Sequence, residues 1–291
     1  MTITPQQLED RRKGIGASDV PALFGCGYRT AYDLWLDKTG KLSEDANESN
    51  EAMEIGNDLE PAIGQMAAKR LRLEPSFEGL IASPPTFIHP AGVLRANLDF
   101  LANFAGGLQT IVEAKSTAVG DDWGPEGTDD VPNRVIFQVQ AQFACSGLKI
   151  AHVAQLLMRF RASFRLYQVD RNQEICDAIV ERAHEFWTKN VVADIPPDGI
   201  PSLDVVKHVV RVPKKTISIP PATAAAYLSA TEDAKVAEEA RDAAKAALIA
   251  ALGDAEEGVY DGGRFTYFEQ TRKETVQRAS TFRVLRAAKA K

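Results

Sequence analysis

The sequence has no apolar run approaching the ~20 residues that a membrane-spanning helix needs. Its three cysteines, Cys26, Cys145 and Cys176, are odd in number and widely spaced, which argues against a disulfide framework and against a zinc or iron–sulfur site. Its four histidines are equally scattered, so a histidine-based metal or nucleophile site is not expected. The N-terminus lacks the apolar core of a signal peptide, which predicts a cytoplasmic protein.

The composition is that of an ordinary soluble globular protein. Of the 291 residues, 45% are hydrophobic and 25% are charged, which is enough chain for one large core with an appendage. The net charge of −6 argues mildly against a general nucleic-acid coat protein, although binding depends on where charge sits rather than on its sum. Acidic residues gather between residues 44 and 60, whereas basic residues dominate from residue 264 onward. On charge alone, this tail fits a DNA-facing surface and a solvated terminus equally well.

The stretch over residues 95–117, RANLDFLANFAGGLQTIVEAKST, predicts a β-hairpin. Two apolar runs flank a short loop that contains Gly106, and such a loop between strand-like runs is typical of hairpins. With Gly106 at the centre of the loop, Asp99 lies opposite Glu113. Because side chains alternate across a strand, Glu113 and Lys115 then share one face, and Asp99 joins them there.

Two carboxylates that face each other across a sheet repel, unless a divalent cation such as Mg²⁺ binds both of them. A lysine two residues farther along could then hold or deprotonate a water on that cation. The arrangement of Asp99, Glu113 and Lys115 therefore indicates metal-assisted phosphodiester hydrolysis. The alternative is an exposed hairpin face with ordinary solvated charges, because a Glu-x-Lys tripeptide occurs by chance in most long chains.

Two segments before the hairpin carry further candidate residues. Ser18 follows a run of cations and fits the N-cap of a helix, where backbone N–H groups can bind phosphate; a capped helix beside solvated cations fits equally well. Glu60 lies in an amphipathic helix predicted over residues 51–71. The adjacent Pro61 should kink that helix or start a new first turn, and the irregularity could aim the carboxylate inward.

Two segments after the hairpin add amides and cations. Gln138 and Gln140 fall in a helix predicted between a proline at residue 132 and a glycine at residue 147, and they could reach a phosphate or face solvent. Arg159, Arg161 and Arg165 recur at even spacing near a predicted strand. This spacing predicts cations on one strand face, where they could contact a DNA backbone.

The order of predicted elements favours an α/β protein with a central mixed β-sheet flanked by helices. Strands at 149–158 and 161–169 follow the glutamine-bearing helix, and a helix at 174–189 comes next. We expect a core domain of residues 1–201 and a C-terminal extension of residues 202–291. The extension is predicted to hold short strands, one alanine-rich helix and a basic tail, with the strands and the helix at 205–212, 216–219, 221–252 and 264–270.

Five segments, in matching order, resemble the YqaJ-type viral recombinase family. These are the phage alkaline exonucleases related to lambda exonuclease, within the PD-(D/E)XK nuclease superfamily. The segments are GIGASDVPALFG at 14–25, AYDLWLDKTG at 31–40, IGNDLEP at 55–61, ANLDF with VEAK, and QVQAQFACSG at 138–147. The resemblance spans roughly the first 195 residues and implies a restriction-endonuclease-like core with a helical C-terminal extension.

The resemblance also implies roles for single residues. Asp99 and Glu113 match the metal-binding acids, and Lys115 matches the lysine of the E-x-K motif. Glu60 matches the helix glutamate that completes a second metal position.

A supporting glutamine and a phosphate pocket are implied as well. Gln138 or Gln140 matches the glutamine of the supporting helix. Ser18 and Arg11 (or Arg12, if the match shifts by one residue) resemble the serine and arginine that hold the 5′ phosphate at the end of a duplex.

The function implied by the resemblance is that of a Mg²⁺-dependent 5′→3′ exonuclease on double-stranded DNA ends, with Mn²⁺ as a substitute for Mg²⁺. It would leave 3′ single-stranded tails for phage recombination in the bacterial host cell, with a single-strand annealing protein as partner and a homotrimer as assembly. Two alternatives stay open. One is a structure-selective or restriction-like endonuclease with the same metal site, and the other is a non-catalytic DNA-binding protein on a nuclease fold.

Overall fold

A computed structural model describes residues 12–43, 51–118 and 122–271 of the chain. It divides into two compact units, Met1–Arg211 and Val212–Lys291. The boundary predicted after residue 201 leaves the short helix α7 (Leu203–Val206) outside the core, whereas the division in the structure keeps α7 in the first unit. The predicted phosphate ligand Arg11 and most of the predicted basic tail lie outside the described residues.

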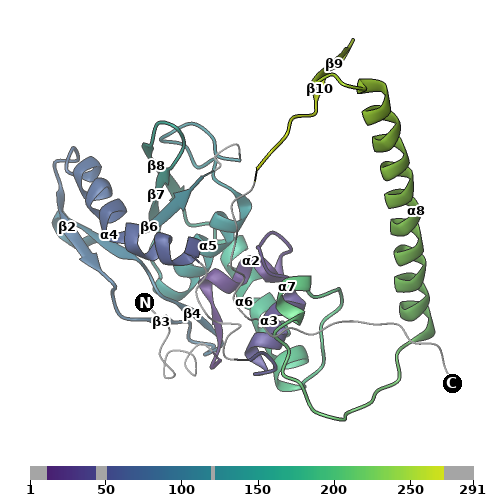
Figure 1. Ribbon diagram of the computed structural model, residues 1–291. Coiled ribbons are helices and arrows are strands. Elements are labelled where there is room, and N and C mark those ends of the chain that lie inside the picture. The colour runs from purple at the N-terminus through teal and green to yellow at the C-terminus, as the bar shows by residue number, and fades with distance from the viewer. Residues whose placement is uncertain (1–11, 44–50, 119–121, 272–291) are drawn as a thin grey trace. The chain divides into compact units, whose positions relative to one another are not determined.

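A five-stranded mixed sheet forms the centre of the first unit, in the order β2-β5-β6-β7-β8 (Figure 1). Its strands are Phe77–Ala82, Phe100–Phe104, Leu108–Thr117, Ile150–Leu157 and Ser163–Asp170. Strands β6 and β7 run parallel, and the other neighbours are antiparallel. The predicted α/β class with a central mixed sheet is therefore confirmed.

Strands β5 and β6 form the predicted hairpin around a tight turn, Ala105–Gly107. Gly106 and Gly107 both have a φ of 79°, a left-handed conformation that glycine adopts readily because it has no Cβ. Phe100 pairs with Val112 in this hairpin, which is the register predicted from a loop centred on Gly106. One further step along this register places Asp99 across from Glu113.

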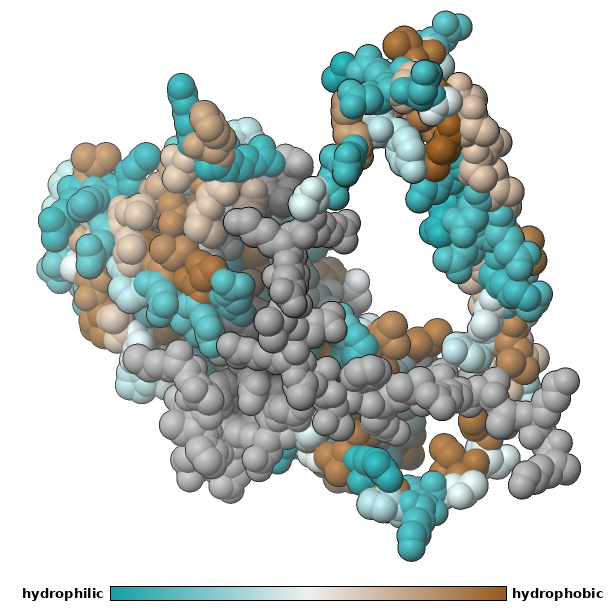
Figure 2. All heavy atoms as spheres, in the orientation of Figure 1, coloured by the Kyte–Doolittle hydropathy of each residue, from teal (hydrophilic) through white to brown (hydrophobic). Residues whose placement is uncertain are grey.

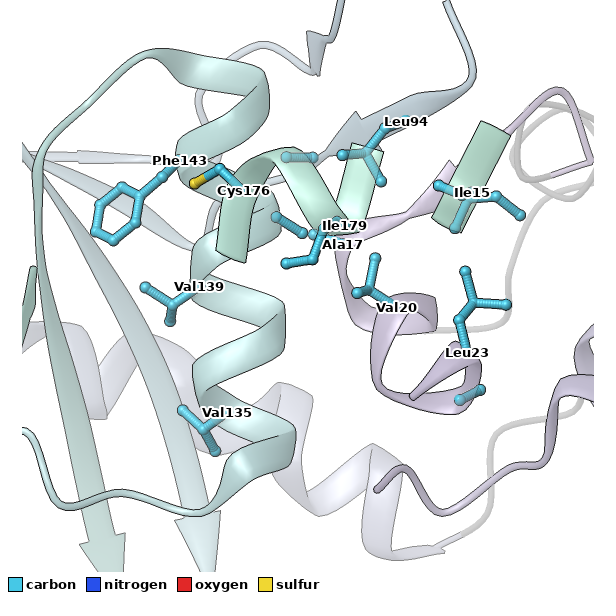
Figure 3. Packing of buried hydrophobic residues seen from close by; sticks show 14 of the residues in the cluster. Ile15, Ala17, Val20, Leu23, Leu94, Val135, Val139, Phe143, Cys176 and Ile179 are labelled. Atoms are coloured by element: carbon cyan, nitrogen blue, oxygen red, sulfur yellow. The ribbon is translucent and has the colours of Figure 1, made fainter. Parts of the chain in front are cut away.

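Helices cover both faces of the sheet. Helix α4 (Glu51–Leu71) packs against Val112, and helix α5 (Asn133–Ser146) belongs to the cluster that contains Ile111. Because neighbouring residues of a strand point to opposite faces, α4 and α5 lie on opposite sides of the sheet. Every fourth residue of α5 contributes to this core, as Figure 3 shows for Val135, Val139 and Phe143.

A smaller sheet, in the order β1-β4-β3, and several helices complete the first unit. The strands of this sheet are Ile15–Gly16, Phe87–Ile88 and Leu94–Ala96. The helical elements are η1 (Ala17–Asp19), α2 (Val20–Leu23), α3 (Ala31–Lys38), α6 (Gln173–Phe186) and its π-helical continuation η4 (Trp187–Val192). Figure 3 shows side chains of β1, α2, α5 and α6 that belong to one hydrophobic cluster.

Helix α4 runs continuously through Pro61, although the sequence predicts a kink or a fresh first turn there. The helix also approaches the sheet very closely at Gly64. A Cβ at this position would lie 2.4 Å from Cζ of Phe100, so only glycine fits without movement of the ring. Glycine at this position therefore brings α4 close to the start of β5.

The strand predicted at 205–212 is wrong, because residues 205 and 206 lie in helix α7 and the rest holds only an isolated bridge between Val209 and Leu42. Ser202 caps that helix by accepting a hydrogen bond from the backbone N–H of Val205, and this local bond outweighs the β propensity of the valines. The strand predicted at 216–219 is also absent from this described segment.

The second unit contains the predicted alanine-rich helix, α8 (Pro221–Leu252), followed by a hairpin of β9 (Glu257–Tyr260) and β10 (Gly263–Thr266). The sequence predicts a strand in the region of β10 and misses its partner β9. Figure 2 shows hydrophobic and hydrophilic residues side by side on the surface of α8. In the described part of the chain, no helix is both long enough and apolar enough to span a bilayer.

Candidate active site

The two acids of the hairpin meet at the point where β5 begins. Asp99 directly precedes β5, and its Oδ2 accepts a hydrogen bond from the backbone N–H of Ala114, at 2.8 Å. Glu113 lies within β6 and is only 1% exposed. The antiparallel register, extended by one residue, thus brings a half-buried and a fully buried carboxylate to the same part of the sheet.

Three side-chain donors surround the carboxylate of Glu113. Lys115 Nζ and Gln138 Nε2 both lie 2.6 Å from Oε1, and Gln142 Nε2 lies 2.6 Å from Oε2. Lys115 Nζ also donates to Oε1 of Gln138, at 3.0 Å. Because both oxygens accept hydrogen bonds, the negative charge of Glu113 is well supported despite its burial.

The charges of the site act on one another strongly. Burial first, and then the negative charge of Glu113, raise the pKa of Asp99 well above its ordinary value. Burial alone would lower the pKa of Lys115, but the charge and the hydrogen bond of Glu113 raise it overall, so the amine stays protonated. Lys115 keeps 26% of its side chain exposed.

Glu60 of α4 belongs to the same electrostatic cluster. The pKa of Glu60 is raised, mainly by burial and next by the charge of Glu113, whereas the charge of Lys115 opposes the rise. The half-buried carboxylate of Glu60 therefore interacts electrostatically with Glu113 of the hairpin, although α4 lies on the other face of the sheet from α5.

The glutamines of α5 divide into two sets. Gln138 and Gln142 are four residues apart, and both contact Glu113. Gln140 is turned away from this site: its Nε2 donates to the carbonyl of Asp170, and its Oε1 accepts from the backbone N–H of Asn172. Of the two candidates from the sequence, the structure brings Gln138 and not Gln140 to the acids.

Gln142 was missed by the sequence analysis. Its side chain is fully buried, and its Oε1 has no hydrogen-bond partner among the described residues. The helical period of 3.6 residues would have found it, because a residue four positions after Gln138 shares the face of α5 that meets Glu113.

Ser18 lies apart from these contacts. It is exposed within the short turn η1 and does not cap a helix; the residue in the N-cap position of η1 is Gly16. The turn is held by Asp19, whose Oδ2 accepts from the backbone N–H of Gly16 at 3.0 Å and lies 2.7 Å from Nζ of Lys38. The expected N-cap role of Ser18 is therefore wrong, and among the described residues Ser18 forms no hydrogen bond with the acids of the hairpin.

The donor set of the hairpin suits a hard divalent cation. Among the described residues, no three Asp, Glu, His or Cys side chains converge as a ready-made metal-binding group. Mg²⁺, however, needs only one or two carboxylates together with waters and substrate phosphates, and Asp99 and Glu113 can supply these. Burial first, and then the charge of Glu113, raise the pKa of Asp99, and a bound cation would offset the repulsion between the two carboxylates.

Comparison with known proteins shows which proteins this chain is similar to. Residues 6–149 match the family model of the YqaJ-like viral recombinase domain. A particular relative is the uncharacterized protein YqaJ of Bacillus subtilis (strain 168), which is 28% identical over 193 residues. The matched part is 65% of this chain and 57% of that relative, so the chain spans little more than half of the relative's length.

Two similar solved structures are exonucleases by their descriptions. One is the alkaline exonuclease LHK-Exo from Laribacter hongkongensis, with 18% identity, a TM-score of 0.44, and coverage of 66% of this chain and 94% of that chain. The other is a phage-related exonuclease from Haemophilus somnus 129PT, with 13% identity, a TM-score of 0.43, and coverage of 62% of this chain and 96% of that chain.

Proposed function

We propose that this chain is a Mg²⁺-dependent deoxyribonuclease that degrades double-stranded DNA from its ends in the 5′→3′ direction. The observation that carries the proposal is the contact between Lys115 and Glu113 beside Asp99, with Gln138 bonded to both Lys115 and Glu113. A solvated hairpin face would not bury an acid behind three donors. The viral recombinase family supports DNA as the substrate.

Each residue of the site has a proposed task. Asp99 and Glu113 would hold Mg²⁺, with Glu60 as a further carboxylate, and Mn²⁺ would bind to the same oxygens. When bound, the cation would polarise the scissile phosphate and lower the pKa of a water molecule. Lys115, as an ammonium, would orient the attacking water by donating to it from Nζ, and Gln138 would fix the direction of that ammonium through its Oε1.

The polarity and the products rest on the family resemblance. Removal of nucleotides from 5′ ends would leave 3′ single-stranded tails suited to annealing with a complementary strand. An annealing protein as partner, a homotrimeric assembly, and a 5′-phosphate contact by Ser18 and Arg11 remain predictions.

A comparison of DNA substrates tests the function. Linear duplexes with and without 5′ phosphates, labelled at either end, are incubated beside a covalently closed circle in Mg²⁺ and in EDTA. We expect nucleotide release from the linear duplexes in Mg²⁺ alone, starting at the 5′ ends and favoured by the phosphate. Cutting of the closed circle would instead identify an endonuclease, and binding without cutting would identify a non-catalytic protein on a nuclease fold.

A further inference from the structure

The sheet carries cations beyond the acidic site, on strand β8 and in the turn before it. Of the three arginines that recur in the sequence, Arg165 lies in β8, whereas Arg159 and Arg161 lie in the exposed turn between β7 and β8. The spacing predicted that all three lie on one strand face, and this prediction is wrong. Each has a different relation to the site.

The strand register places Arg165 in the same row as the lysine of the site. Lys115 pairs with Gln155 on β7, and Gln155 pairs with Arg165 on β8. Paired residues on neighbouring strands point to the same face, and strands lie about 4.8 Å apart. Arg165 therefore lies about 10 Å across the sheet from Lys115, on the face that α5 covers at Glu113.

Side-chain contacts confirm that Lys115, Gln155 and Arg165 point to the same face of the sheet. The amide of Gln155 donates from Nε2 to Oγ1 of Thr117, at 2.9 Å. Its Oε1 accepts from the hydroxyl of Tyr167, at 3.3 Å. Thr117 lies two residues beyond Lys115 on β6, and Tyr167 lies two residues beyond Arg165 on β8, so both belong to the face of those two cations.

Two of the three arginines have no carboxylate partner within the described part of the chain. Arg165 is half-buried, yet neither Arg165 nor Arg161 forms an ion pair with a described residue. Two arginines nearby do have acidic partners, since Arg70 pairs with Glu126 and Arg134 pairs with Asp122. A half-buried guanidinium without a counter-ion, beside a site for phosphodiesters, fits a phosphate of the substrate.

The turn between β7 and β8 also presents an aromatic ring. Phe160 is entirely exposed between Arg159 and Arg161. Exposing a whole phenylalanine ring to water is unfavourable, and such an exposed apolar side chain often marks an interaction site. Aromatic rings flanked by cations are the usual platform on which unpaired bases stack, whereas the cations contact the backbone.

We propose that Arg165, Arg161 and Phe160 form a track for the DNA strand that is being cut. Arg165 binds a phosphate within a few nucleotides of the scissile one, because it lies about 10 Å across the sheet from Lys115. Arg161 binds a phosphate farther along, and Phe160 stacks on an unpaired base of that strand. This inference rests on the proposed nuclease function and adds the path of its substrate.

The salt dependence of binding gives the first test. Binding of a short duplex with a single-stranded overhang is measured in EDTA, over a range of salt concentrations, for the wild type and for Arg165→Gln. Each lost phosphate contact should lower the slope of log K against log[salt] by about 0.7 to 0.9. Arg165→Lys keeps the charge and should restore the slope. Lys149→Gln, which removes an exposed charge before the opposite end of β7, should leave the slope unchanged.

Neutral methylphosphonate linkages, placed singly along the strand to be cut, give the second test. The wild type should lose roughly tenfold in affinity when the neutral linkage lies at one position within a few nucleotides of the scissile phosphate. Arg165→Gln should show no further loss at that position, and Phe160→Ala should weaken binding to the overhang more than binding to a blunt duplex. Equal losses for the wild type and Arg165→Gln at every position would overturn the track.

The outcomes separate this inference from the function on which it rests. Wild-type protein that cuts DNA, together with Arg165→Gln and Phe160→Ala variants that bind and cut like it, would refute the track and leave the nuclease intact. Wild-type protein that neither binds nor cuts DNA would refute the function itself. Thermal melting of each variant identifies any change that merely reflects misfolding.

Discussion

Gln142 offers the sharpest test of how the site is built, because it supports Glu113 without reaching solvent. We consider the substitution Gln142→Met, which keeps a side chain of similar length and removes the donor to Oε2 of Glu113. The carboxylate would keep Lys115 and Gln138 on its other oxygen. Its Oε2 would be left buried without a partner, free to turn away from the position that a cation needs.

The expected size follows from the contact. A hydrogen bond to a buried, charged group contributes about 1.5–3 kcal/mol, which corresponds to roughly a tenfold to 150-fold effect. Groups that orient a metal ligand typically account for about 10–100-fold in metal affinity or activity. We therefore expect Gln142→Met to raise the Mg²⁺ concentration for half-maximal nucleotide release by about 10–100-fold, or to lower kcat by as much.

Gln140 provides a matched control on the same helix. It is as well buried as Gln142, but its hydrogen bonds go to the backbone at Asp170 and Asn172. Gln140→Met should therefore lower the melting temperature while leaving the Mg²⁺ dependence of the folded protein unchanged. If Gln142→Met folds and keeps both its Mg²⁺ dependence and its kcat within twofold of the wild type, the role of this amide is refuted.

Three other substitutions have defined outcomes. Lys115→Ala should lower the rate of nucleotide release by about 10²–10⁴-fold with DNA binding retained, as measured by single-turnover digestion and by anisotropy; an unchanged rate would contradict the role of the ammonium. Because the pKa of Asp99 is raised in the folded state, its protonation favours folding, and this contribution is lost as pH rises through the folded pKa. Asp99→Asn should thus raise the melting temperature of the metal-free protein at pH 8, by an amount that shrinks as pH falls toward the ordinary carboxyl pKa of about 3.9. The same substitution should abolish stabilisation by Mg²⁺. A lower melting temperature of the variant at pH 8 would count against the electrostatic cluster. Gly64→Ala should lower the free energy of unfolding, because overpacking against Phe100 costs about 1–3 kcal/mol and a gain in helix propensity of about 1 kcal/mol offsets only part of it; denaturant melts that show no loss would disprove the close contact.

The hairpin was predictable from the sequence because its information is local. A glycine turn between two apolar runs fixes which residues lie opposite each other, and the observed pairing of Phe100 with Val112 follows from that turn. Because its neighbours Val112 and Ala114 pack beneath helix α4, Glu113 points to the opposite face, where the glutamines of α5 contact it. Alternation along a strand is thus enough to place two acids and a lysine together.

The contacts of the glutamines were harder to predict from the sequence, because they depend on how α5 is rotated about its axis against the sheet. The sequence shows three glutamines at alternate positions, and the rotation decides that Gln138 and Gln142 face the acids while Gln140 faces Asp170. The prediction of a strand at Val205 and Val206 was wrong for a different reason. The side chain of Ser202 accepts a hydrogen bond from the backbone N–H of Val205, and this cap stabilises a short helix although valine has a high β propensity.

The parallel pairing of β6 with β7 has a consequence for the lengths that this chain can accept. Parallel neighbours need a crossing segment between them, and α5 forms part of that segment. A residue inserted or deleted after Gln138 would turn the rest of the helix by about 100°, which would swing Gln142 away from Glu113. The turn between β7 and β8 lies outside the ladder and can grow without such a shift. As far as the fold is concerned, that turn can therefore change in length, but an insertion there would displace Phe160 and Arg161, whereas the middle of α5 tolerates no change of length.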